Sequence, residues 1–440
     1  MPKETLEGLQ NRLYDDATSL FMLADLLEAT GPIDLDPDDD NLTVDGDPPD
    51  ELAEVISRGR SETADVLRMH GAMFVEEAES LRGDGTRGPY FQVRKSQDWF
   101  LYALAMPDRQ FRAIFRIGRR TFDIFCEILE ENPIFTSRGC KPQRHIAWQL
   151  GAFLIRYGQL GSPVLDTSLK LGIGYGTIIL YCRCVTRAVR ELKKKYAPWF
   201  SKDDHGDGSL IQTSDKPSWI GSAYLTRKGF FAYALFAIVD GDLRFGAWDL
   251  GWPGSVTDAR VFKNSHFWRH RHQYLSDGRY ILVDKGYPST PFTVRPFSEP
   301  ELAQASEKDR RRMKDFNFTL SSERIRVEHA FGCFKLRFQS ARMMGIHKDV
   351  QDVWRALDAL LVMHNMCLWH NDHPKHLEDY RDSLRDDDAP GGNHDEPEVD
   401  EQVFDTPDIP AEETAAWLKD RGLELRQQLL DQVFPEEDYK

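Results

Sequence analysis

The sequence predicts an α/β fold in its central part, preceded by an all-helical region and flanked by acidic ends. Apolar residues recur three and four positions apart through much of residues 91–200, which is the periodicity of buried α-helices. After residue 210, short apolar runs bounded by Gly and Asp alternate with helical patterns. This alternation is typical of a layered α/β domain.

Charge is unevenly distributed along the 440 residues, which have a formal net charge of −16 at pH 7. Residues 1–90 contain 22 acidic and 7 basic side chains, and residues 369–440 contain the same numbers, so each end has a net charge of −15. Residues 91–368 contain 28 acidic and 42 basic side chains, a net charge of +14. A basic middle attracts a polyanion such as DNA, whereas acidic ends compete with it or keep the protein soluble.

We divide the chain into four regions on these grounds. Residues 1–90 are an acidic, partly disordered N-terminal region, in which a helical pattern at 6–29 is either a partner-binding helix or a plain surface helix. Residues 91–200 are helical, 201–370 form the α/β domain, and 371–440 are an acidic, mostly disordered tail with a late helix near its end.

Cysteine and hydropathy patterns exclude several classes of protein. Six cysteines are scattered without a C-x-x-C pair, so neither a zinc ribbon nor a disulfide framework is indicated, and a reducing compartment fits. The longest apolar run, at 230–239, is about half the length of a membrane span. We therefore expect a soluble intracellular protein with no membrane partner.

The helical region contains the pattern of a helix-turn-helix. Apolar periodicity in 145–158 and 176–196 predicts two helices, and the glycines from Gly172 to Gly176 predict a turn just before the second. Two interpretations remain open, a DNA-contacting unit and a plain helical hairpin.

The α/β region predicts its elements in a definite order. We expect two strands within 229–255 joined by a turn at Asp240–Asp242, a helix over 256–268, a short buried strand ending at Asp284, a polar basic connection over 298–322, an amphipathic helix from 324, and a buried helix over 353–370.

The amphipathic helix carries one carboxylate between two cations. On a helical wheel, apolar residues from Val327 to Phe338 gather on one side, and Arg324, Glu328 and Lys335 lie on the border of that stripe. An ordinary ion pair between Arg324 and Glu328, four residues apart, is one explanation for this pattern.

Three further carboxylates offer a second explanation for Glu328. Asp284 ends an apolar strand, Asp258 starts a helix, and Asp207 precedes the strand pair. Asp258 also suits a helix cap and Asp207 a turn. If these carboxylates converge on one edge of the sheet, they form an oxygen-only site suited to Mg²⁺ or Mn²⁺.

The motifs together resemble one known family. The segments "DGS", "GWPGSVTD", "VDKGYP", "NFTLSSERIRVEHAFGCFKLRF" and "MHNMC" resemble, in order and spacing, the DDE nuclease domain of the PIF/Harbinger transposases over residues 205–370. The resemblance implies an RNase H-like fold and a metal-dependent DNA nuclease. It also implies a nuclear location, a separate Myb-like DNA-binding partner and possible homo-oligomers.

The resemblance assigns roles to individual residues. It makes Asp207, Asp284 and Glu328 the catalytic carboxylates, adds Asp258 as a further metal ligand, and assigns DNA-phosphate contacts to a set of cations: Arg324, Lys335 and Arg337. The helix then fits the R-x₃-E-x₆-K pattern of related transposases.

The sequence departs from the family pattern just before Asp207. In the family a buried strand runs into the first aspartate, but the residues "FSKDDHG" before Asp207 are polar. We therefore expect that strand to be missing, which places nuclease activity in doubt. Three functions remain open: a DNA transposase, a catalytically inactive transposon-derived protein that binds DNA or chromatin, and an adaptor that acts through its acidic ends.

Overall fold

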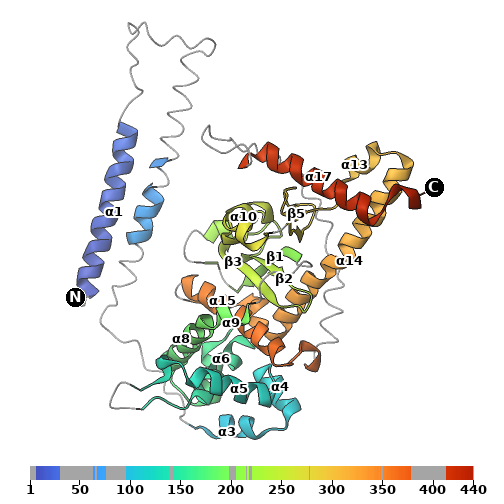
Figure 1. Cartoon of the computed structure of the whole chain (residues 1–440). Coiled ribbons are helices and arrows are strands. Elements are labelled where there is room, and N and C mark those ends of the chain that lie inside the picture. The colour runs from blue at the N-terminus through green and yellow to red at the C-terminus, as the bar shows by residue number, and fades with distance from the viewer. Residues whose placement is uncertain are drawn as a thin grey trace. The chain divides into compact units, whose positions relative to one another are not determined.

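The structure is a computed structural model of the whole chain (Figure 1). Described residues are 6–29, 63–64, 67–75, 96–137, 142–197, 205–214, 216–217, 221–276, 278–345, 347, 350–377 and 413–439. Much of the acidic N-terminal region predicted to be partly disordered, and most of the predicted disordered tail, lie outside these ranges. Contacts divide the chain into one unit of residues 1–90 and another of residues 91–440.

The first unit contains the predicted N-terminal helix. Helix α1 covers Leu6–Ala29, the segment in which apolar residues recur at helical spacing, and a second helical stretch covers 67–75. Ala17 and Ala24 are buried. This confirms the helix but leaves open whether it binds a partner.

The second unit begins with the helical region, which confirms the predicted helices. Its helices are α3 (Asp98–Ala105), α4 (Asp108–Phe115), α5 (Arg119–Glu130), α6 (Ile146–Tyr157), α7 (Val164–Leu171), α8 (Tyr175–Glu191) and α9 (Lys193–Tyr196). Gly172 ends α7 with φ +62°, and a Cβ there would lie 2.2 Å from the Ser96 carbonyl oxygen. Only glycine fits this turn without strain.

A mixed six-stranded sheet follows, with strand order β3-β2-β1-β4-β5 and β6 beside β1. Its strands are β1 (His205–Thr213), β2 (Ala232–Val239), β3 (Phe245–Pro253), β4 (Ile281–Leu282), β5 (Thr293–Val294) and β6 (Met343–Met344). Strand β1 pairs antiparallel with β2 and parallel with β4 and β6. The predicted hairpin of β2 and β3 is confirmed, and Asp240 closes its turn by accepting hydrogen bonds from the amides of Asp242 and Arg244, each 2.9 Å long.

Helices cover both faces of the sheet. One face packs against α14 (Glu307–Arg337) and α15 (Val350–Trp369), and the same hydrophobic core continues into α6 and α8. The other face packs against α10 (Asp258–Asn264), α11 (His266–Arg269) and α12 (Arg271–Tyr274). In Figure 1, α10 lies beside the sheet and α14 extends away from it. The predicted α/β class is confirmed at the level of a mixed sheet with a helix-rich N-terminal part.

A third, smaller core joins the C-terminal segment to α14. Helix α17 (Ala415–Val433) packs against α13 (Glu299–Gln304), α14 and β5, with Leu430 fully buried (Figure 1). The late helix predicted in the tail is therefore confirmed. Short 3₁₀ turns complete the described elements: η1 (Pro133–Phe135), η2 (Gly221–Tyr224), η3 (Gln339–Ala341), η4 (Pro374–His376) and η6 (Glu436–Asp438).

One prediction of secondary structure is wrong. The polar connection expected over 298–322 is mostly helical, because α14 begins at Glu307 and continues without a break through the amphipathic helix. Its polar first half is held by Arg312, which is 1% exposed and donates to the Phe434 carbonyl (2.8 Å) and to Asp431 (2.5 Å).

The strand that we expected to be missing is present, and it contains Asp207. Strand β1 begins at His205, which is buried, so Asp207 lies inside the strand rather than after it. Pairing with β2 runs continuously from His205 to Gln212. The polar residues before position 205 therefore do not remove the strand that holds Asp207.

Candidate active site at the β1–β4 pair

Two of the predicted carboxylates meet across neighbouring strands. His205 pairs with Leu282 in the parallel β1–β4 ladder, so Asp207 and Asp284 each lie two residues beyond the pair. Residues at the same level of adjacent parallel strands lie on the same face, about 4.8 Å apart. The sheet therefore brings together two acids that are distant in sequence.

Arg324 bridges these two aspartates from α14. Its Nη2 donates to Asp207 Oδ2 at 2.9 Å, and its Nη1 donates to Asp284 Oδ1 at 3.1 Å. The same Nη2 lies 4.0 Å from Glu328 Oε1, one helical turn further on. The ion pair that the sequence suggested between Arg324 and Glu328 is thus the longest of three, and Arg324 is chiefly a link to the strands.

Each aspartate also receives a backbone hydrogen bond. The Gly208 amide donates to Asp207 Oδ1 (2.8 Å), and the Lys285 amide donates to Asp284 Oδ1 (2.7 Å). Burial raises the pKa of Asp207, and the charge of Arg324 opposes this rise. Burial alone would lower the pKa of Arg324, but the charges of Asp207 and Asp284 outweigh burial and raise it. The bridge thus consists of opposite charges held largely away from water.

Asp258 approaches this pair from the other face of the sheet. It is the first residue of α10, and its Oδ1 lies 2.3 Å from the point where a side chain at position 208 would place its Cβ. Glycine at 208 therefore makes room for the Asp258 carboxylate against β1, at the position next to Asp207. The helix-start position that the sequence suggested for Asp258 is confirmed.

Three of the four predicted acidic residues differ clearly in exposure. The side chains of Asp207 and Asp284 are 17% and 29% exposed, whereas that of Glu328 is 66% exposed. Among the described residues, no group of three or more His, Cys, Asp or Glu side chains is arranged to hold a metal ion. The Arg324 guanidinium lies between the two aspartates, where a shared cation would have to bind.

The donor chemistry nevertheless fits a divalent cation. Asp207 and Asp284 already direct one oxygen each toward a single positive group, and carboxylate oxygens are the preferred ligands of Mg²⁺ and Mn²⁺. The fit requires Arg324 to leave its bridge, because two cations at one point repel each other.

The structure places the three predicted DNA-binding cations in different settings. Arg324 lies in the site, and half-buried Lys335 donates from Nζ to the Leu210 carbonyl of β1 at 3.0 Å. The prediction for Arg337 is wrong. This residue is 0% exposed, and its guanidinium donates to the Arg116 carbonyl (2.8 Å) and to Asp372 (3.2 Å), so no phosphate can reach it.

The basic residues of the helix-turn-helix-like unit are also partly neutralised. Arg183 donates to Asp352 at 2.5 Å and Arg190 to Asp358 at 2.6 Å, so both α8 cations pair with α15.

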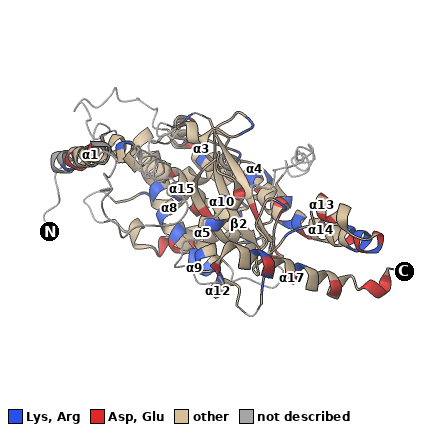
Figure 2. Ribbon diagram, turned by 90° about the horizontal axis from the view of Figure 1, so that it is seen from above, with Lys and Arg blue, Asp and Glu red and all other residues tan. Residues whose placement is uncertain are grey.

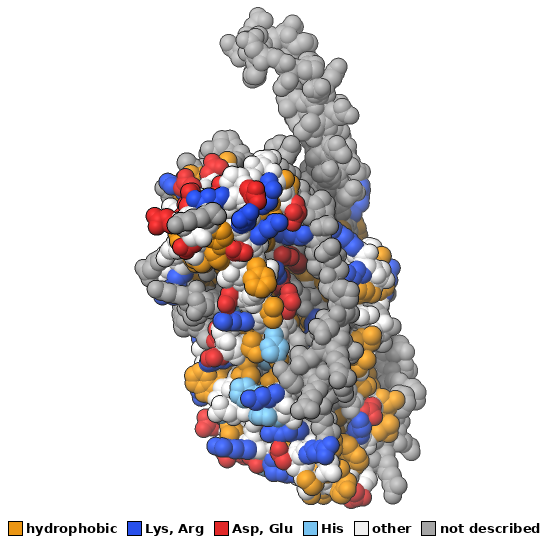
Figure 3. Space-filling view, turned by 90° about the vertical axis from the view of Figure 1, so that its right-hand side faces the viewer, with side chains coloured by type: hydrophobic (Ala, Val, Ile, Leu, Met, Phe, Trp, Pro, Cys, Tyr) orange, Lys and Arg blue, Asp and Glu red, His pale blue; other side chains and the backbone are white. Residues whose placement is uncertain are grey.

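Figure 2 shows Lys and Arg along α8 and α9, and acidic residues near the C-terminus. Figure 3 shows the face where α13, α14 and α17 meet, with both charge signs interspersed.

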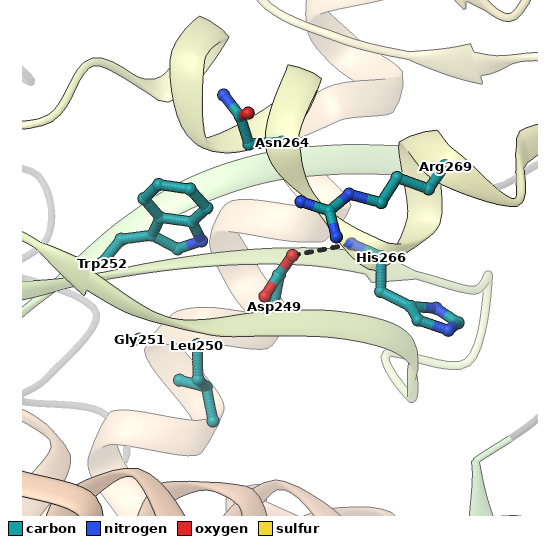
Figure 4. A pocket seen from close by; sticks show the side chains of 7 residues that line it. All are labelled: Asp249, Leu250, Gly251, Trp252, Asn264, His266 and Arg269. Carbon is teal, nitrogen blue, oxygen red and sulfur yellow. Dashed lines mark hydrogen bonds between the residues drawn. The ribbon is translucent and has the colours of Figure 1, made fainter.

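A polar hollow of about 310 Å³ lies between β3, α10 and α11 (Figure 4). Asp249 accepts a hydrogen bond of 2.9 Å from the His266 amide there. Asp249 pairs with Phe236, which pairs with Gly208, so the hollow lies two strands, or about 10 Å, from the carboxylate site. Asp249 and its pocket were not found from the sequence, because no motif marks them.

Sequence comparisons relate the part of the chain that contains these residues to known proteins. Residues 206–365 match the family described as DDE superfamily endonuclease, and this range contains all four predicted acidic residues. The chain is also 23% identical over 244 residues to a protein of Arabidopsis thaliana described as Protein ALP1-like. That similarity covers 46% of this chain and 60% of the relative, and no solved structure matches.

Proposed function

We propose that this chain is a metal-dependent DNA nuclease of the Harbinger transposase type. The observation that carries the proposal is the convergence of Asp207, in β1, and Asp284, just after the neighbouring β4, on one cationic group within a region similar to DDE endonucleases. Its substrate class is the DNA phosphodiester bond, and its reaction is strand cleavage followed by joining.

An RNase H-like core is part of the proposal. The strand order β3-β2-β1-β4-β5, with β1 antiparallel to β2 and parallel to β4, supports it. The position of α10 after β3 supports it too, because α10 brings Asp258 to the central strand.

The residues of the site have distinct proposed roles. Asp207 and Asp284 would hold Mg²⁺ or Mn²⁺, with Asp258 and Glu328 as further ligands. Two such ions, when bound, would lower the pKa of the attacking hydroxyl and stabilise the leaving oxygen. Arg324, released from its bridge, and Lys335 would hold the phosphates beside the scissile bond.

The biological setting follows from the same proposal. A nuclease acting on chromosomal DNA works in the nucleus, and a Myb-like protein would supply sequence-specific binding. The net charge of +14 in residues 91–368 supports attraction to DNA, although pairing between α8 and α15 neutralises part of it. Assembly as a homo-oligomer would bring two sites to two DNA ends. Among the described residues, no helix has the length and apolar character needed to cross a membrane.

One observation favours a second candidate, a catalytically inactive DNA-binding protein of the same descent. Arg324 satisfies Asp207 and Asp284 without a metal, and Glu328 remains mostly exposed. If the arginine never leaves, the site stabilises the fold and carries out no chemistry.

Calorimetric titration with Mn²⁺ separates the two candidates without knowledge of the DNA target. The parent protein is compared with Asp284→Asn and Glu328→Gln, and we expect binding in the parent that is weakened in both variants. Glu323→Gln is the matched control, because Glu323 lies on the same helix but pairs with Arg326 at 3.1 Å.

Plasmid nicking then tests the chemistry itself. Supercoiled DNA with Mn²⁺ should be nicked by the parent and by Glu323→Gln, but not by Asp284→Asn. Absence of Mn²⁺ binding in the parent would reject the nuclease and leave the DNA-binding candidate, which a salt-dependent duplex titration examines directly.

A further inference from the structure

Tyr287 has a buried hydroxyl beside the carboxylate site that the proposed reaction does not yet use. The residue is 3% exposed and lies three positions after Asp284, with its amide donating to the Asp284 carbonyl at 3.1 Å. Its hydroxyl is one of the buried polar groups, among the described residues, that have no protein hydrogen-bond partner. A buried group in this state requires a physical explanation, because leaving it unbonded is costly.

The ring of Tyr287 is fixed by its neighbours. It packs edge-on against Phe262, with ring centroids 5.6 Å apart, and lies 6.1 Å from the ring of Phe236. Both phenylalanines belong to the core on the α10 face of the sheet. The hydroxyl therefore cannot turn toward water without disrupting that core.

The charged groups around Tyr287 are those of the site. Burial raises the pKa of Tyr287 well above its usual range, and the negative charges of Asp258 and then Asp207 raise it further. The packing also places Tyr287 near Asp258, because Phe262 lies one helical turn after Asp258 on α10. On the strand side, Phe236 pairs with Gly208, against which the Asp258 carboxylate lies. The hydroxyl remains a neutral donor that no protein acceptor, Asp258 included, satisfies by a direct hydrogen bond.

We propose that Tyr287 is a positioning residue of this site, whose hydroxyl orients the Asp258 carboxylate toward Asp207 through one bridging water molecule. This inference rests on the proposed function, because it concerns the same carboxylates. The phenol donates to the water, and the water donates to Asp258. Partners that orient ligand groups in this way change metal affinity by about 10- to 100-fold when they are removed.

Tyr287→Phe tests the inference, because it removes only the oxygen and keeps the ring against Phe262. We expect about 10- to 100-fold weaker Mn²⁺ binding by calorimetry, with a melting temperature of the metal-free protein that is unchanged or lower. Tyr233→Phe is the matched control. It removes another buried phenol oxygen, but Tyr233 packs against Tyr224 and Trp354 on the opposite face, so Mn²⁺ affinity should not change.

A double-mutant cycle measures the coupling between Tyr287 and Asp258 in Mn²⁺ binding. A role of Tyr287 in packing alone would give no such coupling. If Tyr287 acts through Asp258, combining Tyr287→Phe with Asp258→Asn should weaken Mn²⁺ binding little more than Asp258→Asn alone. Independent, additive losses would overturn the inference.

Failure of the inference can be distinguished from failure of the proposed function. Equal Mn²⁺ affinity in the parent and Tyr287→Phe would reject Tyr287 and leave the nuclease intact. Lack of Mn²⁺ binding by the parent would reject the nuclease instead. In that case the metal-free melting temperature still decides about the hydroxyl: a rise in Tyr287→Phe would mean that the oxygen has no partner, which overturns the inference.

Discussion

Asp207 lies within β1 and Asp284 lies just after the end of β4, each two residues beyond the His205–Leu282 pair, and the two share the guanidinium of Arg324. The relationship depends on strand register, because a shift of one residue would turn one aspartate to the other face of the sheet. It also makes the arginine and a metal ion competitors for the same two carboxylates.

Arg324→Gln should strengthen Mn²⁺ binding, because the competing cation is removed while Asp207 and Asp284 remain. The same change should lower the free energy of unfolding of the metal-free protein by about 3 kcal/mol, since two partly buried carboxylates lose their partner. Calorimetry and urea unfolding measure the two effects. Arg326→Gln, on the same helix with an exposed partner, should change neither. Weaker Mn²⁺ binding in Arg324→Gln would contradict the competition.

Gly208→Ala should weaken Mn²⁺ binding, because the added Cβ would lie 2.3 Å from Asp258 Oδ1 and push that carboxylate away from β1. We expect about a tenfold loss of Mn²⁺ affinity, as for the removal of a residue that orients a ligand. Gly176→Ala serves as the control, since nothing lies within 4 Å of its added methyl group. Unchanged affinity in Gly208→Ala would exclude Asp258 from the site.

Arg337→Met should destabilise the fold without acting on DNA directly. The guanidinium is fully buried and bonded to Asp372, and removing one partner of a buried pair costs about 3–5 kcal/mol. Urea unfolding measures the loss. The salt dependence of duplex binding, which counts phosphate contacts, should keep the slope of the parent at a temperature where both proteins are folded. A shallower slope would restore Arg337 as a DNA contact.

Acidification should destabilise the protein through His364. Burial lowers the pKa of this imidazole from 6.5 to about 3, and the charge of Arg337 adds to the effect. Since the folded-state pKa lies below the unfolded one, the stability contribution is complete above pH 6.5 and is lost as the pH falls toward 3. Between pH 7 and 5 the loss from this residue is about 2 kcal/mol. Melting temperatures of the parent and His364→Gln across this interval should converge at low pH.

Local patterns in the sequence were sufficient to predict much of the fold. The hairpin of β2 and β3 follows from apolar runs around an Asp-Gly turn, and α15 follows from a long apolar periodicity. The first half of α14 was not found in this way, because its few apolar residues are separated by charged ones and pack in a core completed by the distant C-terminal segment, which also binds Arg312. Strand β1 was predicted to be missing because its first residues are polar, and they are buried through pairing with neighbouring strands, which composition does not reveal.

The candidate site shows the same division. The residue types and their spacing identified Asp207, Asp258, Asp284 and Glu328, but no spacing predicts that Arg324 bridges two strands. Likewise, Arg337 has the residue type of a DNA contact, and only the tertiary fold buries it beside Asp372. The surroundings of a charged side chain depend on segments that are distant along the chain. Local sequence patterns do not predict which of those segments will pack against it.

The short length of β4 has a consequence for how long the site persists. Only Ile281 and Leu282 form this strand, and a single residue pair joins it to β1, whereas β1 and β2 pair along eight positions. Local opening events follow the number of hydrogen bonds and buried contacts that they break. The amides of β4 should therefore exchange with solvent deuterium sooner than those of β2, and each opening would separate Asp284 from Asp207 while the rest of the sheet stays intact.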